Sequence, residues 1–295
     1  TFQGSDTGIS IQNLEVNTEE KDIDIKANGW IQNITKQPSW HLQLDNLAFS
    51  DTSLEFLTKV IPQIPSELKQ LGSIQMNGVC ERLPQGSGML KTIIHSGVGS
   101  IDVQVDMNAS QQFNGHILTD GINLRQLLND TKFGIVATNM AVSGQINKQQ
   151  KPDIAIDGTI GQFDYNGYSF SQISINGNYK RGNISGFLNI DDPNISAQLQ
   201  GELTEDIFAN KPQKPASIRL QGAISHLAPA AIHLTDQWGN VVMSGDIEAD
   251  LTARHLNDAQ GSLHISHFHL SATDDAPGYY PDNLSINVDT IFGLS

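Results

Sequence analysis

The stretch that decides the fold reads Gly182-Asn-Ile-Ser-Gly-Phe-Leu-Asn-Ile-Asp-Asp-Pro-Asn-Ile-Ser-Ala-Gln-Leu-Gln-Gly201. Apolar residues alternate before the Asp-Asp-Pro-Asn sequence and again after it, at Ile184, Leu188, Ile190, Ile195, Ala197 and Leu199. A period of two is typical of a β-strand with one apolar face. Residues 191–194 supply an even number of turn residues, which lets both strands present their apolar side chains on the same face. The stretch therefore predicts an antiparallel hairpin whose polar sequence serves as a turn.

The same alternation recurs along the whole chain. Further runs lie at 101–107, 142–146, 154–160, 173–179, 218–224 and 241–253, separated by clusters of Asn, Asp, Gly and Pro. By this template the chain holds on the order of eighteen strands with short connections. A parallel sheet would need a helix between most strands, so we expect a mainly antiparallel, all-β protein.

Helical signals are few and short. Thr52-Ser-Leu-Glu55 reads as a capping box that opens a helix ending at Pro62. A second short piece is expected at 66–71, and further candidates of one or two turns lie at 122–129 and 227–234.

Several strands carry glycine at an apolar-face position, as in Ile156-Asp-Gly158-Thr-Ile160 and Leu220-Gln-Gly222-Ala-Ile224. Such glycines indicate bends, bulges or a surface that something approaches closely. The alternative is that they only mark strand ends.

Composition excludes some classes of function. The chain of 295 residues has a net charge of −15, with acidic residues scattered along it, and this disfavours nucleic acid as a partner. Aromatic residues make up only 6% of the chain, so the core is expected to consist of Val, Ile and Leu. Cys80 is the single cysteine, which rules out an intrachain disulfide and a cysteine-based zinc site. We expect it to be a small buried hydrophobe.

No catalytic motif stands out. The chain lacks a Gly-x-Ser-x-Gly elbow, a phosphate-binding loop and a His-Glu-x-x-His sequence, so we expect no enzymatic activity and no cofactor. The densest metal candidate is His264-Ile-Ser-His-Phe-His269, with His255 nearby. His267 and His269 would share a strand face there, whereas His264 would need a bulge to join them. Exposed strand histidines are the simpler interpretation. Asp22, Asp24 and Asp191-Asp192 lack the spacing of a calcium loop.

Longer stretches resemble a known family. They are Tyr165-Asn-Gly-Tyr-Ser-Phe-Ser-Gln-Ile-Ser-Ile-Asn-Gly-Asn-Tyr179 and the segment 181–201 that follows it. Together they resemble the repeat region of the AsmA-like proteins, specifically the translocation and assembly module TamB family. Gly115-His-Ile-Leu-Thr-Asp-Gly-Ile-Asn-Leu-Arg-Gln-Leu-Leu128 is similar to that family's unit of a strand leading into a short helix. Segments 226–236 and 243–251 resemble the next such unit.

The resemblance implies a fold and a function. The fold is an elongated, mainly antiparallel sheet curved into an open U-shaped groove, the β-taco, with a few short helices. The function is that of a bridge-like lipid-transfer protein that shields phospholipid acyl chains between inner and outer membrane in the periplasm. The resemblance further implies an inner-membrane anchor on the full-length protein and, through it, an outer-membrane barrel partner.

The resemblance and the alternation together assign the parts of the chain. Residues 1–7 read as the remnant of a cleavable tag or a disordered start, and 8–295 as one continuous repeat region of a longer protein. The expected groove residues are Val103, Val105, Ile156, Ile160, Ile184, Leu188, Ile190, Ile195, Leu199, Leu220, Ile224, Met243, Ile247 and Leu251.

Two other readings stay open, because alternation alone does not distinguish a groove from an ordinary packed core. One is an adhesin-like or structural β-repeat domain that binds protein or glycan. The other, more distant, is a carbohydrate-active β-helix enzyme.

Overall fold

The computed structural model describes residues 2–5, 7–20, 22–60, 66–146, 152–204, 215–235, 239–253, 260–272 and 283–289. The chain divides into two compact units, residues 1–146 and 147–295, which are described separately below. The expected repeat region 8–295 spans both units, and alternating strands dominate each of them. Among the described residues, no helix has the length and apolar character needed to cross a membrane.

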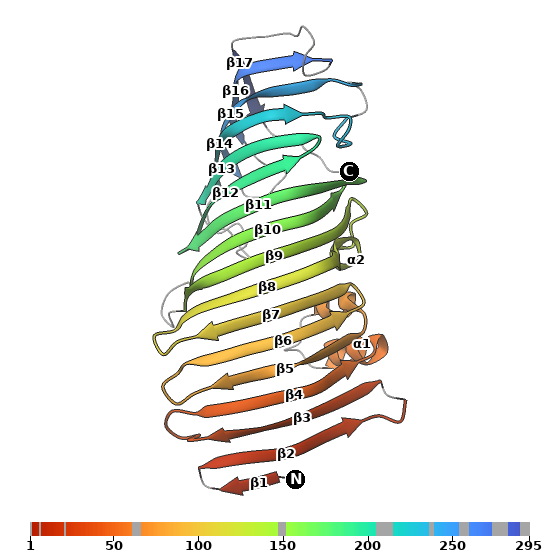
Figure 1. Ribbon diagram of the computed structural model, residues 1–295, viewed down its shortest axis with the longest axis vertical. Helices are drawn as coiled ribbons and strands as arrows, with labels where there is room; N and C mark the ends of the chain where they lie inside the picture. Colours follow the sequence, from red (N-terminus) through yellow and green to blue (C-terminus); the bar gives the residue numbers. More distant parts are fainter. Residues whose placement is uncertain are drawn as a thin grey trace. The chain divides into compact units, whose positions relative to one another are not determined.

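Unit 1 is an antiparallel meander in which each strand pairs with the next one along the chain (Figure 1). Its strands are β1 (Phe2–Ser5), β2 (Gly8–Asn17), β3 (Ile23–Gln32), β4 (Ser39–Phe49), β5 (Ile74–Arg82), β6 (Gly88–Ser96), β7 (Gly99–Met107), β8 (Gln112–Asn123) and β9 (Phe133–Gln145). Its helices are α1 (Asp51–Val60), the 3₁₀ helix η1 (Ser66–Leu71) and α2 (Leu124–Leu128).

Unit 2 repeats this arrangement, again with pairing between consecutive antiparallel strands. Its strands are β10 (Asp153–Tyr165), β11 (Tyr168–Lys180), β12 (Asn183–Asp192), β13 (Ile195–Thr204), β14 (Ala216–Leu227), β15 (Val242–Ala253), β16 (Gln260–Ser271) and β17 (Asn283–Asp289). No helix occurs in the part of unit 2 that the structure describes. The expected all-β, mainly antiparallel fold with a few short helices is therefore confirmed.

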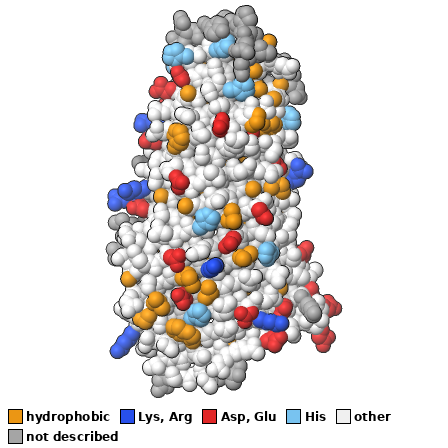
Figure 2. All heavy atoms as spheres, in the orientation of Figure 1, with side chains coloured by type: hydrophobic (Ala, Val, Ile, Leu, Met, Phe, Trp, Pro, Cys, Tyr) orange, Lys and Arg blue, Asp and Glu red, His pale blue; other side chains and the backbone are white. Residues whose placement is uncertain are grey.

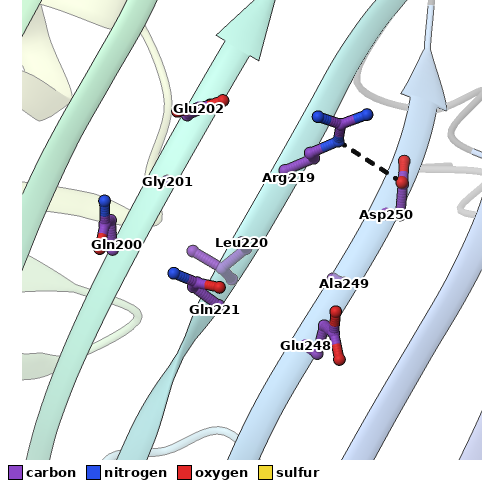
Figure 3. Close-up of a pocket in the computed structure, with 9 residues that line it drawn as sticks. All are labelled: Gln200, Gly201, Glu202, Arg219, Leu220, Gln221, Glu248, Ala249 and Asp250. Carbon is purple, nitrogen blue, oxygen red and sulfur yellow. Dashed lines mark ion pairs between the residues drawn. The ribbon is translucent and has the colours of Figure 1, made fainter.

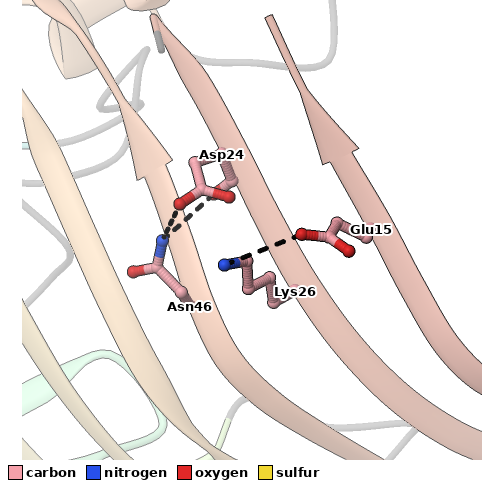
Figure 4. Close-up of polar contacts among 4 residues, drawn as sticks. All are labelled: Glu15, Asp24, Lys26 and Asn46. Carbon is pink, nitrogen blue, oxygen red and sulfur yellow. Dashed lines mark hydrogen bonds and ion pairs between the residues drawn. The ribbon is translucent and has the colours of Figure 1, made fainter.

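Register divides the sheet of unit 1 into two chemically distinct faces. Apolar side chains line up across the strands on one face, as in the paired set Val16–Ile25–Leu47–Met76–Ile94–Ile101. On the other face Lys26 lies 3.7 Å from Glu15, and Asn46 donates a hydrogen bond of 2.9 Å to the carboxylate of Asp24 (Figure 4). Figure 2 shows a face on which charged, histidine and single hydrophobic side chains are interspersed. We call these surfaces the apolar face and the polar face.

The helices of unit 1 lie at one margin of its sheet (Figure 1). Gly97 N–H donates to the carbonyl of Leu71 in η1, and the Gln126 amide of α2 donates to the carbonyl of Gln70. Two strongly buried apolar side chains of unit 1, Leu54 of α1 and Val98 of the β6–β7 turn, lie at this margin and are each only 4% exposed. The helices thus lie beside the strand ends at this margin.

The helix boundaries differ from expectation in two places. Helix α1 already begins at Asp51, and its capping hydroxyl belongs to Ser50, which accepts a hydrogen bond of 3.2 Å from the Ser53 N–H. The expected capping box at Thr52 is therefore wrong. The helix expected at 227–234 is also wrong, because Leu227 ends β14 and Pro229 follows within a run of hydrogen-bonded turns.

Glycines on the apolar face mark close backbone approach, as one of the two readings expected. A Cβ atom on Gly222 would lie 2.0 Å from the carbonyl oxygen of Gln198 on the paired strand. The corresponding distances are 2.3 Å from Gly78 to the Lys91 oxygen and 2.4 Å from Gly29 to the His41 oxygen. At these points, backbone of the neighbouring strand therefore occupies the space that a side chain on the apolar face would need.

We expect Gly222→Ala to lower the free energy of unfolding by about 1–3 kcal/mol, since the added methyl group meets backbone that cannot swing away. Gly161→Ala is the matched control, because a Cβ there has no atom within 4 Å. It should be neutral or stabilise the protein by about 0.4–1 kcal/mol. Urea denaturation of both variants measures the difference, and equal stabilities would contradict a close approach at Gly222.

Candidate functional site

The candidate site is the apolar face, and twelve of the fourteen expected groove residues lie on it in unit 2. The strand register aligns them in cross-strand pairs: Ile184 with Leu203, Leu188 with Leu199, Ile190 with Ala197, Ala197 with Ile224, Gly222 with Ile247, and Ile218 with Leu251. Leu220 pairs with Gly201 on one side and Ala249 on the other. The hairpin formed by residues 182–201 therefore presents the apolar side chains of both its strands on one face, as expected.

The remaining two expected residues lie in unit 1. Val103 pairs with Thr92 and Ile117, and Val105 with Leu90 and Gly115. Both valines belong to the apolar face of that unit.

The exposure of these fourteen side chains separates them from a sealed core. Each of these side chains is partly accessible to solvent, neither buried nor fully exposed. Full burial on this face occurs at a few other positions, such as Ala27 and Leu44 in unit 1 and Ile173, Ala197 and Ala249 in unit 2. The apolar face therefore consists of continuous rows of half-buried aliphatic side chains.

One end of the apolar face in unit 2 carries a polar cluster around Asp192, which is only 5% exposed. Its carboxylate accepts hydrogen bonds from the Tyr168 hydroxyl, from the Ser171 N–H (2.9 Å) and hydroxyl (3.0 Å), and from the Asn194 N–H (3.0 Å). The Asn194 side chain in turn donates to the Tyr168 hydroxyl at 3.0 Å. These bonds tie the ends of β11, β12 and β13 together.

Sequence reasoning missed this cluster because it assigned Asp192 to the turn. Strand β12 continues through Asp192 and β13 starts at Ile195, so only Pro193 and Asn194 form the loop. The signal that could have revealed it is position, since Asp192 continues the even-numbered series of Ile184, Leu188 and Ile190.

Burial is the largest influence on Asp192 and by itself opposes ionisation. The hydrogen bonds from Tyr168, Asn194 and Ser171 outweigh it, so the pKa of the Asp192 carboxyl lies below its usual value. Burial, together with the bond to the ionised Asp192, raises the pKa of the Tyr168 hydroxyl. The cluster therefore holds a charged carboxylate against a protonated phenol at neutral pH.

The segment 228–235, called here the end segment, covers the same end of the face. Pro229 is fully buried and Ile232 is 8% exposed. Ala228 N–H donates to the carbonyl of Asn194, and the Asn166 amide donates to the carbonyl of His233 at 2.7 Å. The segment therefore bridges the β12–β13 loop and the β10–β11 loop.

The polar face of β13–β15 is hollowed as well. A depression of about 290 Å³ is lined there by Gln200, Gly201, Glu202, Arg219, Leu220, Gln221, Glu248, Ala249 and Asp250 (Figure 3). Arg219 Nε lies 3.6 Å from Asp250 Oδ2, with both side chains largely exposed. Exposed pairs of this kind contribute little to stability.

The described histidines of the candidate metal site at 264–269 do not converge on a common point. The bulge on β16 lies at His267, which has φ +49° and whose Nδ1 is 2.7 Å from Asp246, whereas His264 and His269 pair with Glu248 and Ser244. His255 lies outside the described residues. Across the described ranges, no three His, Cys, Asp or Glu residues are grouped to hold a metal ion.

Cys80 is half-buried on the apolar face between Leu42 and Leu90. Burial, and to a lesser degree Glu81, raises the pKa of its thiol. A protonated thiol is a poor nucleophile, which agrees with a packing role.

Comparison with known proteins found no match: no protein-family model, no curated protein and no solved structure matches the chain.

Asp192→Asn should lower the free energy of unfolding at neutral pH by about 1–3 kcal/mol, because an amide nitrogen would face donors that the carboxylate now satisfies. Since the folded pKa of Asp192 lies below its unfolded value of about 3.9, its ionisation stabilises the fold above that pH. This stabilisation disappears as the pH falls through the folded pKa. The variant should therefore show a weaker acid dependence than the wild type.

Asp191→Asn provides the control, because Asp191 is the exposed neighbour of Asp192. It should leave stability nearly unchanged when both variants are denatured with urea between about pH 3 and pH 7. A wild-type acid profile in Asp192→Asn would show that the carboxylate does not stabilise the fold.

Proposed function

We propose that this chain is a non-enzymatic lipid conduit whose apolar face shields the acyl chains of phospholipids. The observation that carries the proposal is the half-buried state of all fourteen groove residues, arranged in register across consecutive strands. A closed sandwich core would bury such residues, whereas a face that accepts an apolar ligand leaves them partly accessible.

The energy scale favours a surface of this kind. Exposure to water costs about 0.8 kcal/mol for each methylene group, so a sixteen-carbon chain faces roughly 12 kcal/mol outside a membrane. Apolar contact with rows of Ile, Leu, Val and Met side chains removes most of this cost, and such contact does not depend on direction. None of the fourteen side chains can donate a hydrogen bond, and only the Met243 sulfur is a weak acceptor, so little in the rows favours one position of an acyl chain over the next.

The glycines on the apolar face agree with the same proposal. Gly29, Gly78 and Gly222 put no side chain on that face, and only backbone lies there. The charged headgroup would stay in water at the open side, because burying it without partners is costly. The end segment and the Asp192 cluster would then bound the face at one end of unit 2.

The resemblance to the AsmA-like and TamB proteins extends the proposal to location and partners. It implies a periplasmic location, in a full-length protein anchored in the inner membrane and acting with an outer-membrane barrel partner. In that setting the apolar face would carry phospholipid for outer-membrane biogenesis.

Leu220→Asp should remove bound lipid, because it puts a charge in the middle of the rows next to Gly201 and Ala249. Native mass spectrometry of gently purified protein, with lipid extraction, should detect phospholipid on the wild type and strongly reduced amounts on the variant. Ile156→Asp should also strongly reduce bound phospholipid, because Ile156 lies in the same cross-strand row as Leu220.

Gln221→Asp is the matched control, since it introduces the same charge one residue away on the polar face. It should retain lipid, and circular dichroism would verify that all variants are folded. Equal lipid on Leu220→Asp and the wild type would refute the conduit. Wild-type protein free of lipid would favour a β-repeat domain that binds protein or glycan.

A further inference from the structure

A second site lies on the opposite, polar face, around Trp30 in β3. Register places the indole between Ser10 of β2 and His41 of β4. The His41 ring is stacked with it at 6.3 Å between centroids and 17° between planes. His41 is itself held by Glu81, whose Oε2 lies 3.3 Å from its Nδ1. The indole is therefore supported from β4, while the small side chain of Ser10 leaves room beside it on β2.

Two hollows meet at this indole. One, of about 530 Å³, is lined by Gln3, Gly4, Ser5, Thr7, Gly8, Ile9, Ser10, Trp30, Ile31, Gln32 and Asn33. The other, of about 400 Å³, is lined by Ser10, Ile11, Gln12, Asn13, Asn28, Gly29 and Trp30. Ser10 and Trp30 belong to both, so the two hollows adjoin at the indole.

The described lining of both hollows is uncharged. None of the described residues that line either hollow is Asp, Glu, Lys or Arg, although the chain carries 49 such residues (17 basic and 32 acidic). Two charged groups contact residues of the site: Asp45 accepts a hydrogen bond of 3.4 Å from Asn28, and Glu81 lies 3.3 Å from His41. Hydroxyl and amide groups around one aromatic ring suit a ligand that is polar but neutral.

The amide side chains and the indole also follow one another along β3. Asn28, Trp30 and Gln32 are successive polar-face positions of β3, roughly 6.8 Å apart along the strand. A pyranose ring has one face of C–H bonds, which packs on an indole, and an edge of hydroxyls, which bond to amides. A sugar on Trp30 would therefore have amide partners for its neighbours on both sides.

We propose that the polar face of β2 and β3 binds a neutral, β-linked glycan chain that runs along β3, with one sugar ring stacked on Trp30. Ser10, Asn28 and Gln32 supply hydrogen bonds to the hydroxyls of that ring and its neighbours. This site is independent of the apolar face, so its failure and that of the lipid conduit are distinguishable.

The test uses cellotetraose as the probe in saturation-transfer NMR, followed by titration. The wild type should transfer saturation to the sugar ring protons, and Trp30→Ala should weaken binding about tenfold or more. Phe187→Ala is the matched control, since it removes an aromatic side chain that is 44% exposed on the polar face of unit 2. That variant should bind like the wild type.

Two further measurements sharpen the result. Ser10→Tyr should abolish binding by filling the space beside the indole, and it serves where Trp30→Ala does not fold. Ionic strength of about 1 M should leave affinity unchanged, because a neutral ligand is not screened. Absence of transfer to cellotetraose, binding that survives Trp30→Ala, or capture of decaproline in place of the sugar would each overturn the proposal.

Discussion

Pairing between consecutive antiparallel strands is the constraint on which the rest of this protein depends. Each strand satisfies its backbone donors and acceptors with the strands next to it in the chain, so every side chain is committed to one of two faces. The period-two pattern then puts most aliphatic residues on one side. In unit 2 the described residues form no helix, and the end segment lies at one end of this side.

Two kinds of contact differ along the apolar face. At glycines such as Gly78 and Gly222, neighbouring backbone approaches within a distance that no Cβ would tolerate. At one end of unit 2, by contrast, the Asp192 cluster is polar and bonds the ends of three strands. The proposed lipid would therefore meet apolar side chains along the rows and a hydrogen-bonded polar cluster at one end.

The same alternation makes the two faces of the sheet differ in the side chains that they carry. Alternation gives the polar face as many positions as the apolar one, and most of them carry Gln, Asn, Ser, Asp or Glu. Trp30 departs from that pattern and lies among neutral polar groups, with two hollows beside it. The two proposals therefore assign acyl chains to the apolar face and a hydrated ligand to the polar face.

The sequence by itself determined the all-β class, the antiparallel order and the face on which each groove residue lies, because strand periodicity is a local property that the backbone enforces. It could not determine the end of β12, where Asp192 proved to be buried, nor that the segment after Leu227 forms turns and no helix. Those outcomes depend on partners distant in the chain, such as Tyr168 for Asp192 and Asn166 for His233. The site at Trp30 likewise exists only in three dimensions, since Ser10, Trp30 and His41 become neighbours through register and not through spacing.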